Sequence, residues 1–328
     1  MADSHVIVTF RPPPTVRDAL DQTFHGTADV TYLADVEASG RRKVLASADA
    51  VLAWSLDREL HGPEELAELS SARLVQLVSA GVDEVPLSRI PEGVPVASNA
   101  GAYARPMAEH VLAMALALAK HLPQRHAALE AGVFDQSANR DIRGSSVCVL
   151  GFGGIGRATA RLFEALGARI RAINRSPVQE EWVEWAGTVD DLVTGLREAD
   201  IVVVSLPLTP ATRGLLGARE LSAMKPDAIL INVARGPIID EDALYGHLLD
   251  HPAFQAGLDV WWDEPRKGER FAPRLPFLDL PNVLGSPHNS GITETSLAEA
   301  ARRAAANVVK ALSGAPPDHL VDRREYVD

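Results

Sequence analysis

The chain has 328 residues, 46% hydrophobic and 23% charged, which is enough for two domains of about 100–200 residues, each with its own core. Its formal net charge is -12, and it has no Lys/Arg run, which argues against binding to nucleic acid or to an anionic membrane surface. The single cysteine, Cys148, excludes an internal disulfide and a cysteine-cluster metal site, and it indicates a reducing compartment, the cytoplasm.

The first part of the chain alternates between short apolar runs and helical stretches. Strands are predicted at 6–10, 50–54, 74–78 and 95–98, with a helix at 62–69. The most apolar stretch, 107–119, is shorter than the roughly 20 residues of a membrane span and contains two polar side chains. It predicts a buried helix, so no membrane association is expected.

A second series of strand–helix units follows from residue 146. A helix is predicted at 157–166, and a last one at 293–312 ends before Gly314. This alternation predicts doubly wound parallel α/β domains. The strands of this series are expected at 146–150, 169–173, 201–206, 228–233, 254–260 and 283–286.

A glycine-rich motif, Gly151-x-Gly153-x-x-Gly156, follows the apolar run 147–150. Such glycines allow a tight turn, close approach of backbone to a pyrophosphate, and close packing of helix on strand. The N–H groups of Gly154 and Ile155 would then face the phosphates at the helix start. Glycines also occupy ordinary turns, but the preceding strand and following helix favour dinucleotide binding here.

The end of the next predicted strand indicates which dinucleotide is bound. An NAD-preferring site usually has a carboxylate here for the ribose hydroxyls, whereas this chain has Asn174, Arg175 and Ser176. Arg175 can bind a 2′-phosphate, with help from the Ser176 hydroxyl, so NADP is favoured over NAD. The alternative is that Arg175 is solvated or stacks on the adenine of either cofactor.

Polar residues follow three later strands, in segments 231–237, 257–265 and 285–291, at the strand ends where α/β proteins bind ligands. Arg235 has the planar fork to bind a carboxylate, and His288 can carry a proton near neutral pH. Glu264 would pair with His288 and favour the imidazolium. Each residue alone has a structural reading: Arg235 pairing with Asp240, Glu264 as a loop charge, and His288 as a satisfied histidine. The other nine histidines are read as structural or surface residues, and no metal site is expected.

Together with further matches, these segments resemble the D-isomer-specific 2-hydroxyacid dehydrogenases, in particular glyoxylate/hydroxypyruvate reductases. The further matches are at 79–83, 107–110, 200–202, 207–212 and 240–244. The resemblance implies two Rossmann-like domains, with a dinucleotide-binding domain at 103–286 inserted into a substrate domain made of 1–102 and 287–328. It also implies a homodimer joined through the cofactor domain.

The resemblance further implies hydride transfer between NAD(P)H and a small 2-keto acid or D-2-hydroxy acid. Arg235, Glu264 and His288 would be catalytic, and Arg235 would also bind substrate together with the backbone N–H groups around Ala80 and Gly81. Asp259 would orient the nicotinamide amide. The remaining cofactor contacts implied are Pro207, Thr212, Val233, His288 and Gly291.

The chain departs from the family pattern at Ser205, and two alternative functions are compatible with its motifs. After the predicted strand 201–206 the family often has a histidine before the Pro-Leu-Thr segment, but this chain has Ser205. A phosphite-type anion dehydrogenase is compatible with the motifs, whereas the Glu264–His288 pair argues against a formate dehydrogenase. A nucleotide-sensing interaction protein, like the family's corepressors, could also keep these residues.

Overall fold

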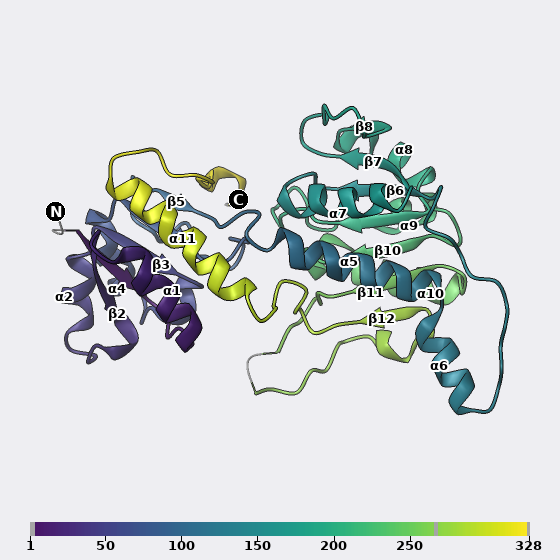
Figure 1. Ribbon diagram of the computed structural model, residues 1–328, viewed down its shortest axis with the longest axis horizontal. Coiled ribbons are helices and arrows are strands. Elements are labelled where there is room, and N and C mark those ends of the chain that lie inside the picture. Colours follow the sequence, from purple (N-terminus) through teal and green to yellow (C-terminus); the bar gives the residue numbers. More distant parts are fainter. Residues whose placement is uncertain (1–3, 266–267, 327–328) are drawn as a thin grey trace. The chain divides into compact units, whose positions relative to one another are not determined.

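The computed structural model describes residues 4–265 and 268–326 (Figure 1). The chain divides into two compact units, and the first is discontinuous because the second is inserted into it. The first unit comprises Met1–Tyr103 and Ile292–Asp328, and the second comprises Ala104–Gly291. Residues 287–291, assigned from the sequence to the substrate domain, group with the second unit because Asp259 hydrogen-bonds their backbone N–H groups.

The first unit contains a five-stranded parallel sheet in the order β2-β1-β3-β4-β5. Helices α1 and α11 pack together on one face (Figure 1). Leu45 of α2, Leu56 of α3 and Leu66 of α4 belong to the apolar core on the other face. The strands are β1 (His5–Val8), β2 (Asp29–Tyr32), β3 (Ala50–Ala53), β4 (Leu74–Leu77) and β5 (Val96–Ala97). The helices are α1 (Pro14–Phe24), α2 (Arg41–Ala46), α3 (Leu56–Glu59), α4 (Pro63–Ala67) and α11 (Ser296–Leu312).

The second unit contains a seven-stranded parallel sheet in the order β12-β11-β10-β9-β6-β7-β8. The strand order reverses direction between β6 and β9, and at such a point loops diverge and leave room for a ligand. The strands are β6 (Ser146–Leu150), β7 (Arg169–Ile173), β8 (Trp185–Gly187), β9 (Ile201–Val204), β10 (Ile229–Asn232), β11 (Gln255–Leu258) and β12 (Val283–Gly285).

Helices cover both faces of this sheet, which explains why its strands are apolar on both sides. Helices α5 and α7 lie side by side over one face (Figure 1), where Phe163 and Val147 belong to the same buried core. Helices α8, α9 and α10 pack on the other face, which includes the buried Cys148. The helices are α5 (Ala104–Ala119), α6 (Leu122–Glu130), α7 (Gly154–Ala165), α8 (Leu192–Arg197), α9 (Ala218–Ala223) and α10 (Glu241–Asp250). These two Rossmann-like units confirm the predicted fold class.

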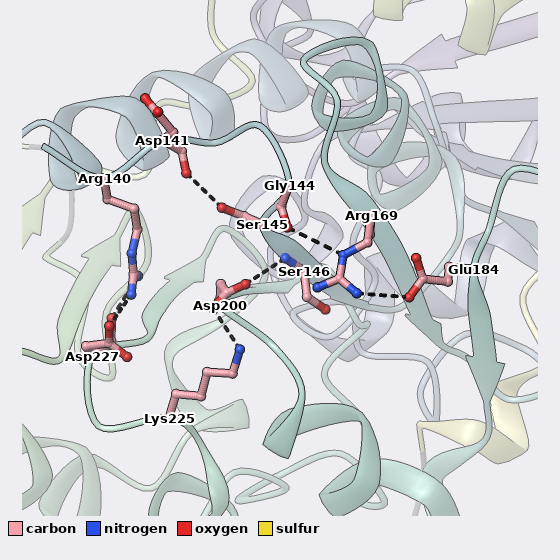
Figure 2. A network of polar contacts seen from close by, with 10 residues as sticks. All are labelled: Arg140, Asp141, Gly144, Ser145, Ser146, Arg169, Glu184, Asp200, Lys225 and Asp227. Atoms are coloured by element: carbon pink, nitrogen blue, oxygen red, sulfur yellow. Dashed lines mark hydrogen bonds and ion pairs between the residues drawn. The ribbon is translucent and has the colours of Figure 1, made fainter.

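A polar network closes the amino-terminal edge of this sheet, at the end of β6 remote from the glycine turn (Figure 2). Asp200 accepts hydrogen bonds of 2.8 Å from the Ser146 N–H and from Lys225 Nζ. Burial raises the pKa of Asp200, but these two donors outweigh that effect and hold the pKa below its usual range. Because these polar groups satisfy one another, we read this edge as structural.

Several elements were not predicted from the sequence, among them β2, β8 and α1. Strand β2 is largely polar and pairs only with β1, at one edge of the five-stranded sheet. Strand β8 has only three residues and lies at one edge of the seven-stranded sheet, so neither strand shows a long apolar run. Helix α1 buries Val16, Ala19, Leu20 and Phe24 at helical spacing, a signal that the proline run before it obscured. Among the described helices, none combines the length and apolar character needed to cross a bilayer.

Candidate active site

A tight turn joins β6 to α7 at the carboxyl edge of the seven-stranded sheet. Gly151 has a φ of +91°, and a Cβ on it would lie 2.7 Å from the carbonyl oxygen of Ser205. A Cβ on Gly156 would lie 2.0 Å from the carbonyl oxygen of Gly151. A Cβ on Gly153, in contrast, would face open space. The first and third glycines are therefore needed for packing, and the second leaves room for a ligand.

The predicted phosphate-binding residues Gly154 and Ile155 lie in the first turn of α7, which starts three residues before the predicted 157. The N-cap, Gly153, brings no side chain to the first-turn N–H groups. Ser205, the departure from the family, donates its hydroxyl to the carbonyl oxygen of Gly151 at 2.8 Å. It therefore fastens the loop after β9 to the turn at the point where the strand order reverses.

The three residues predicted to select the cofactor lie at the carboxyl end of β7. Asn174 Oδ1 accepts a 3.4 Å hydrogen bond from the backbone N–H of Phe152, which lies inside the glycine turn. Arg175 and Ser176 follow, and both are exposed. The structure thus places all three beside the predicted dinucleotide site, with an amide rather than a carboxylate at the strand end.

Glu264 and His288 form a hydrogen-bonded ion pair, with Oε2 and Nδ1 2.7 Å apart. Their side chains are 35% and 39% exposed, so a small molecule can reach them. Burial raises the pKa of Glu264, but the hydrogen bond and charge of His288 bring it below its usual range. The Trp261 N–H, 3.1 Å from Oε1, and the charge of Arg235 act in the same direction. Because Nδ1 is bound by the carboxylate, Nε2 is the ring nitrogen that can serve a substrate.

Arg235 lies three residues after β10 ends at Asn232, immediately before the short helix Gly236–Ile238. A Cβ on Gly236 would lie 2.3 Å from the carbonyl group of Trp261, so the loops after β10 and β11 touch through a residue without a side chain. This contact brings the guanidinium close enough to lower the pKa of Glu264. The structure therefore gathers all three predicted catalytic residues within the second unit.

The loop that carries His288 has an unusual backbone. His288 has a φ of +51°, a left-handed conformation that non-glycine residues rarely adopt. Its N–H donates to the carbonyl oxygen of Asp259 at 2.7 Å, and the next two N–H groups, of Asn289 and Ser290, donate to the Asp259 carboxylate at 3.1 and 3.0 Å. Backbone strain held by such contacts is typical of functional sites.

Two residues of this region were not singled out from the sequence. Ser286 donates to Asp259 Oδ1 at 2.5 Å, and His110 on α5 lies 3.0 Å from the Ser286 hydroxyl. From the sequence, His110 is predicted to be a structural or surface histidine. The available signals were its place in the segment 107–110 and the position of Ser286 two residues before His288.

The remaining predicted residues fall on several loops. Ala80 and Gly81 lie in the first unit, in the loop after β4, where the Ser79 hydroxyl donates to the carbonyl oxygen of Gly81 at 3.0 Å. In the second unit, Pro207 and Thr212 belong to one turn, closed by a 2.6 Å hydrogen bond from the Thr212 hydroxyl to the Pro207 carbonyl oxygen. Val233 follows β10 with a buried side chain, and Gly291 ends the His288 loop.

Residues 112–290 match the family described as D-isomer specific 2-hydroxyacid dehydrogenase, NAD binding domain. The chain belongs to this family. The matched range lies inside the second unit, Ala104–Gly291, which contains the glycine turn and the Arg235–Glu264–His288 group. This confirms the predicted enzyme class, an NAD(P)-dependent dehydrogenase of 2-hydroxy acids, and the use of a nicotinamide cofactor.

Curated relatives and solved structures agree with this assignment. The chain is 31% identical to a glyoxylate/hydroxypyruvate reductase B of Pectobacterium carotovorum over 94% of each chain. It is 32% identical to a D-3-phosphoglycerate dehydrogenase of Methanocaldococcus jannaschii over 76% of this chain, but it spans only about half (47%) of that relative.

Two crystal structures cover 98% of this chain and 99% of their own, each with a TM-score of 0.82. One is a D-isomer specific 2-hydroxyacid dehydrogenase of Xanthobacter autotrophicus in complex with NADPH and MES, 30% identical to this chain. The other is an NADPH-dependent glyoxylate/hydroxypyruvate reductase of Sinorhizobium meliloti with NADP and sulfate, 26% identical.

Proposed function

We propose that this family member reduces small 2-keto acids, with glyoxylate and hydroxypyruvate as first candidates. The observation that carries the proposal is the 2.7 Å pair of Glu264 and His288, with the charge of Arg235 beside it. An acid held by a carboxylate, next to a guanidinium, suits reduction of a carbonyl that carries a carboxylate group. The names of the relatives above support this substrate class.

The second unit fits a nicotinamide dinucleotide. Gly153 leaves open space in front of the first turn of α7, where N–H groups and the helix dipole favour a pyrophosphate. In the loop that carries His288, the Ser290 hydroxyl is buried without a hydrogen-bond partner among the described residues. A buried polar atom of this kind suits a ligand amide, and Asp259, in the same loop, would help to orient it.

In the proposed mechanism Arg235 binds the substrate carboxylate and polarises the keto oxygen. When bound, a nicotinamide cofactor would supply the hydride for the reduction. His288 donates its Nε2 proton to the developing alkoxide, and Glu264 on Nδ1 keeps the ring oriented for that transfer. In the oxidation direction Nε2 accepts the hydroxyl proton.

NADP is the proposed cofactor in preference to NAD. The carboxyl end of β7 presents Asn174, Arg175 and Ser176, with an amide where NAD-specific proteins place a carboxylate. A guanidinium and a hydroxyl at this position would bind a 2′-phosphate.

One panel tests both proposals. Glyoxylate, hydroxypyruvate, pyruvate and larger 2-keto acids are each assayed with NADPH and NADH, for the wild-type protein and for Arg175→Ala. We expect turnover of a 2-keto acid, with kcat/KM higher for NADPH. Arg175→Ala should raise KM for NADPH about tenfold, the scale of a charged hydrogen bond, and leave KM for NADH unchanged. Turnover of phosphite with NAD, and of no keto acid, would contradict the proposed substrate class.

We also propose a homodimer joined through the second unit. Helix α6 buries none of its residues, and the chain beyond it carries Phe134 with 76% of its surface exposed. Leu122, Leu129 and Val133 are each 56% exposed in the same segment. Several large apolar side chains exposed in one segment are typical of a surface that another chain covers. Light scattering should give a dimer mass, and Phe134→Glu should shift it towards the monomer; a wild-type monomer at micromolar concentration would refute the proposal.

A further inference from the structure

A chain of hydrogen bonds runs from α5 into the loop of His288. His110 Nε2 lies 3.0 Å from the Ser286 hydroxyl oxygen, and that hydroxyl donates to Asp259 Oδ1 at 2.5 Å. The hydroxyl has one proton, which goes to the carboxylate, so its oxygen can only accept from His110. This assigns the proton of His110 to Nε2, a tautomer fixed by its partners.

Asp259 is the centre of this arrangement. Its side chain has no solvent exposure, and its carboxylate accepts from the Ser286 hydroxyl and from the N–H groups of Asn289 and Ser290. Those two N–H groups follow His288, whose left-handed backbone turns them towards the same anion. The orientation of the Asp259 carboxylate therefore decides the conformation of the loop that carries His288.

We propose that His110 is a positioning residue for the reaction. Through the Ser286 hydroxyl it fixes the rotation of the Asp259 carboxylate, and the carboxylate in turn holds the His288 loop in its left-handed form. His110 touches neither the Glu264–His288 pair nor, on this proposal, the reactants. The proposal rests on the proton-donor role proposed for His288, because an ordered His288 loop affects turnover only if His288 takes part in it.

If His110 only supported the packing of helix α5, an apolar side chain would suit this position better. Neighbouring residues of α5, such as Val111 and Met114, are buried against the sheet, and an apolar side chain at 110 would extend that contact. The histidine is 25% exposed, and its ring is directed instead at the partly buried Ser286 hydroxyl and, beyond it, the fully buried Asp259 carboxylate. If His110 only supported the helix, its replacement would change stability without a separate effect on kcat.

The kinetic test compares His110→Leu, His110→Gln and Ser286→Ala, with His25→Gln as a control at an exposed site in the first unit. All are assayed as full chains with NADPH and the keto acid turned over fastest by the wild type. We expect His110→Leu and Ser286→Ala to lower kcat about tenfold, with the Tm and the Kd for NADPH little changed.

His110→Gln should recover most of the loss, because a glutamine amide can place an N–H donor where Nε2 lies. His25→Gln should match the wild type. Wild-type kcat in His110→Leu would overturn the proposal. The proposal would also be overturned if His110→Leu and His110→Gln lost kcat equally and in proportion to their fall in Tm.

A measurement without turnover separates this proposal from the proposed function. In ¹⁵N spectra of the free protein at pH 8, His110 should show a protonated Nε2 and an unprotonated Nδ1, and Ser286→Ala should abolish this preference. A His110 ring protonated on Nδ1 would overturn the positioning role. If no keto acid is turned over, the proposed function fails, but the tautomer still tests the hydrogen-bond chain.

Discussion

A methyl group at Gly153 should weaken cofactor binding and leave the fold intact, whereas a methyl at Gly156 should destabilise the second unit. The two glycines belong to one motif, but a Cβ on Gly153 meets no atom within 4 Å. A Cβ on Gly156 lies 2.0 Å from the carbonyl oxygen of Gly151 and 3.0 Å from Val149 Cγ1. Gly153 has a φ of -78° and Gly156 is helical, so alanine suits both backbones. The two positions differ only in the space available to a Cβ atom.

The structure sets the expected magnitudes. Gly153→Ala changes a helix N-cap, at a cost of up to about 1 kcal/mol, so the Tm should fall by about 2–4 °C. Its methyl group would fill the space through which a pyrophosphate reaches the first-turn N–H groups. Loss of one charged hydrogen bond of about 1.5–3 kcal/mol raises the Kd about ten- to hundredfold. Gly156→Ala would push helix α7 away from the glycine turn and lower the free energy of unfolding by about 3 kcal/mol or more. This corresponds to a fall of about 10 °C in Tm.

Both variants are measured by thermal unfolding without ligand and by titration with NADPH, followed by nicotinamide fluorescence. The expected result is a split, with Gly153→Ala folded but weak in binding and Gly156→Ala poorly folded. Wild-type binding of NADPH by Gly153→Ala would contradict the role of Gly153 in leaving space for the cofactor. A wild-type Tm for Gly156→Ala would likewise contradict the close approach of helix α7 to the glycine turn.

Three other changes give distinct outcomes. His288→Gln should lower kcat by about 10³-fold, the range of general acid catalysis, with the Kd for NADPH unchanged in a direct titration. Glu264→Gln should lower kcat by about 10²-fold in the same assay, because the amide cannot replace the charge at Nδ1. Burial, and then the charge of His251, lower the pKa of His247 from 6.5. The unfolded state therefore binds protons first, so the free energy of unfolding should fall as the pH decreases below about 6.5. Urea unfolding at pH 7.5 and 5.5 should show this fall in the wild type and a smaller one in His247→Gln.

Much of the cofactor unit was predictable because its signals are local. The strand before Gly151, the spacing of the three glycines and the helix after them are contiguous, and their packing follows from neighbours in sequence. The edge strands β2 and β8 were not predictable, since each is short and only partly buried, and pairing with a neighbouring strand defines it. His110 was also missed, because its partner Ser286 is 176 positions away in the chain.

Three features can be read from the amino-acid sequence alone: the family resemblance, the alternation that makes two doubly wound sheets, and the identities of Arg235, Glu264 and His288. Residue type and spacing carry that information directly. Three-dimensional packing was needed to show that Glu264 meets His288 at Nδ1, and that Asp259 accepts hydrogen bonds from the left-handed loop that carries His288. These contacts join the carboxyl ends of strands that pair laterally in the sheet. Strand pairing, and not distance along the chain, therefore sets which polar groups meet.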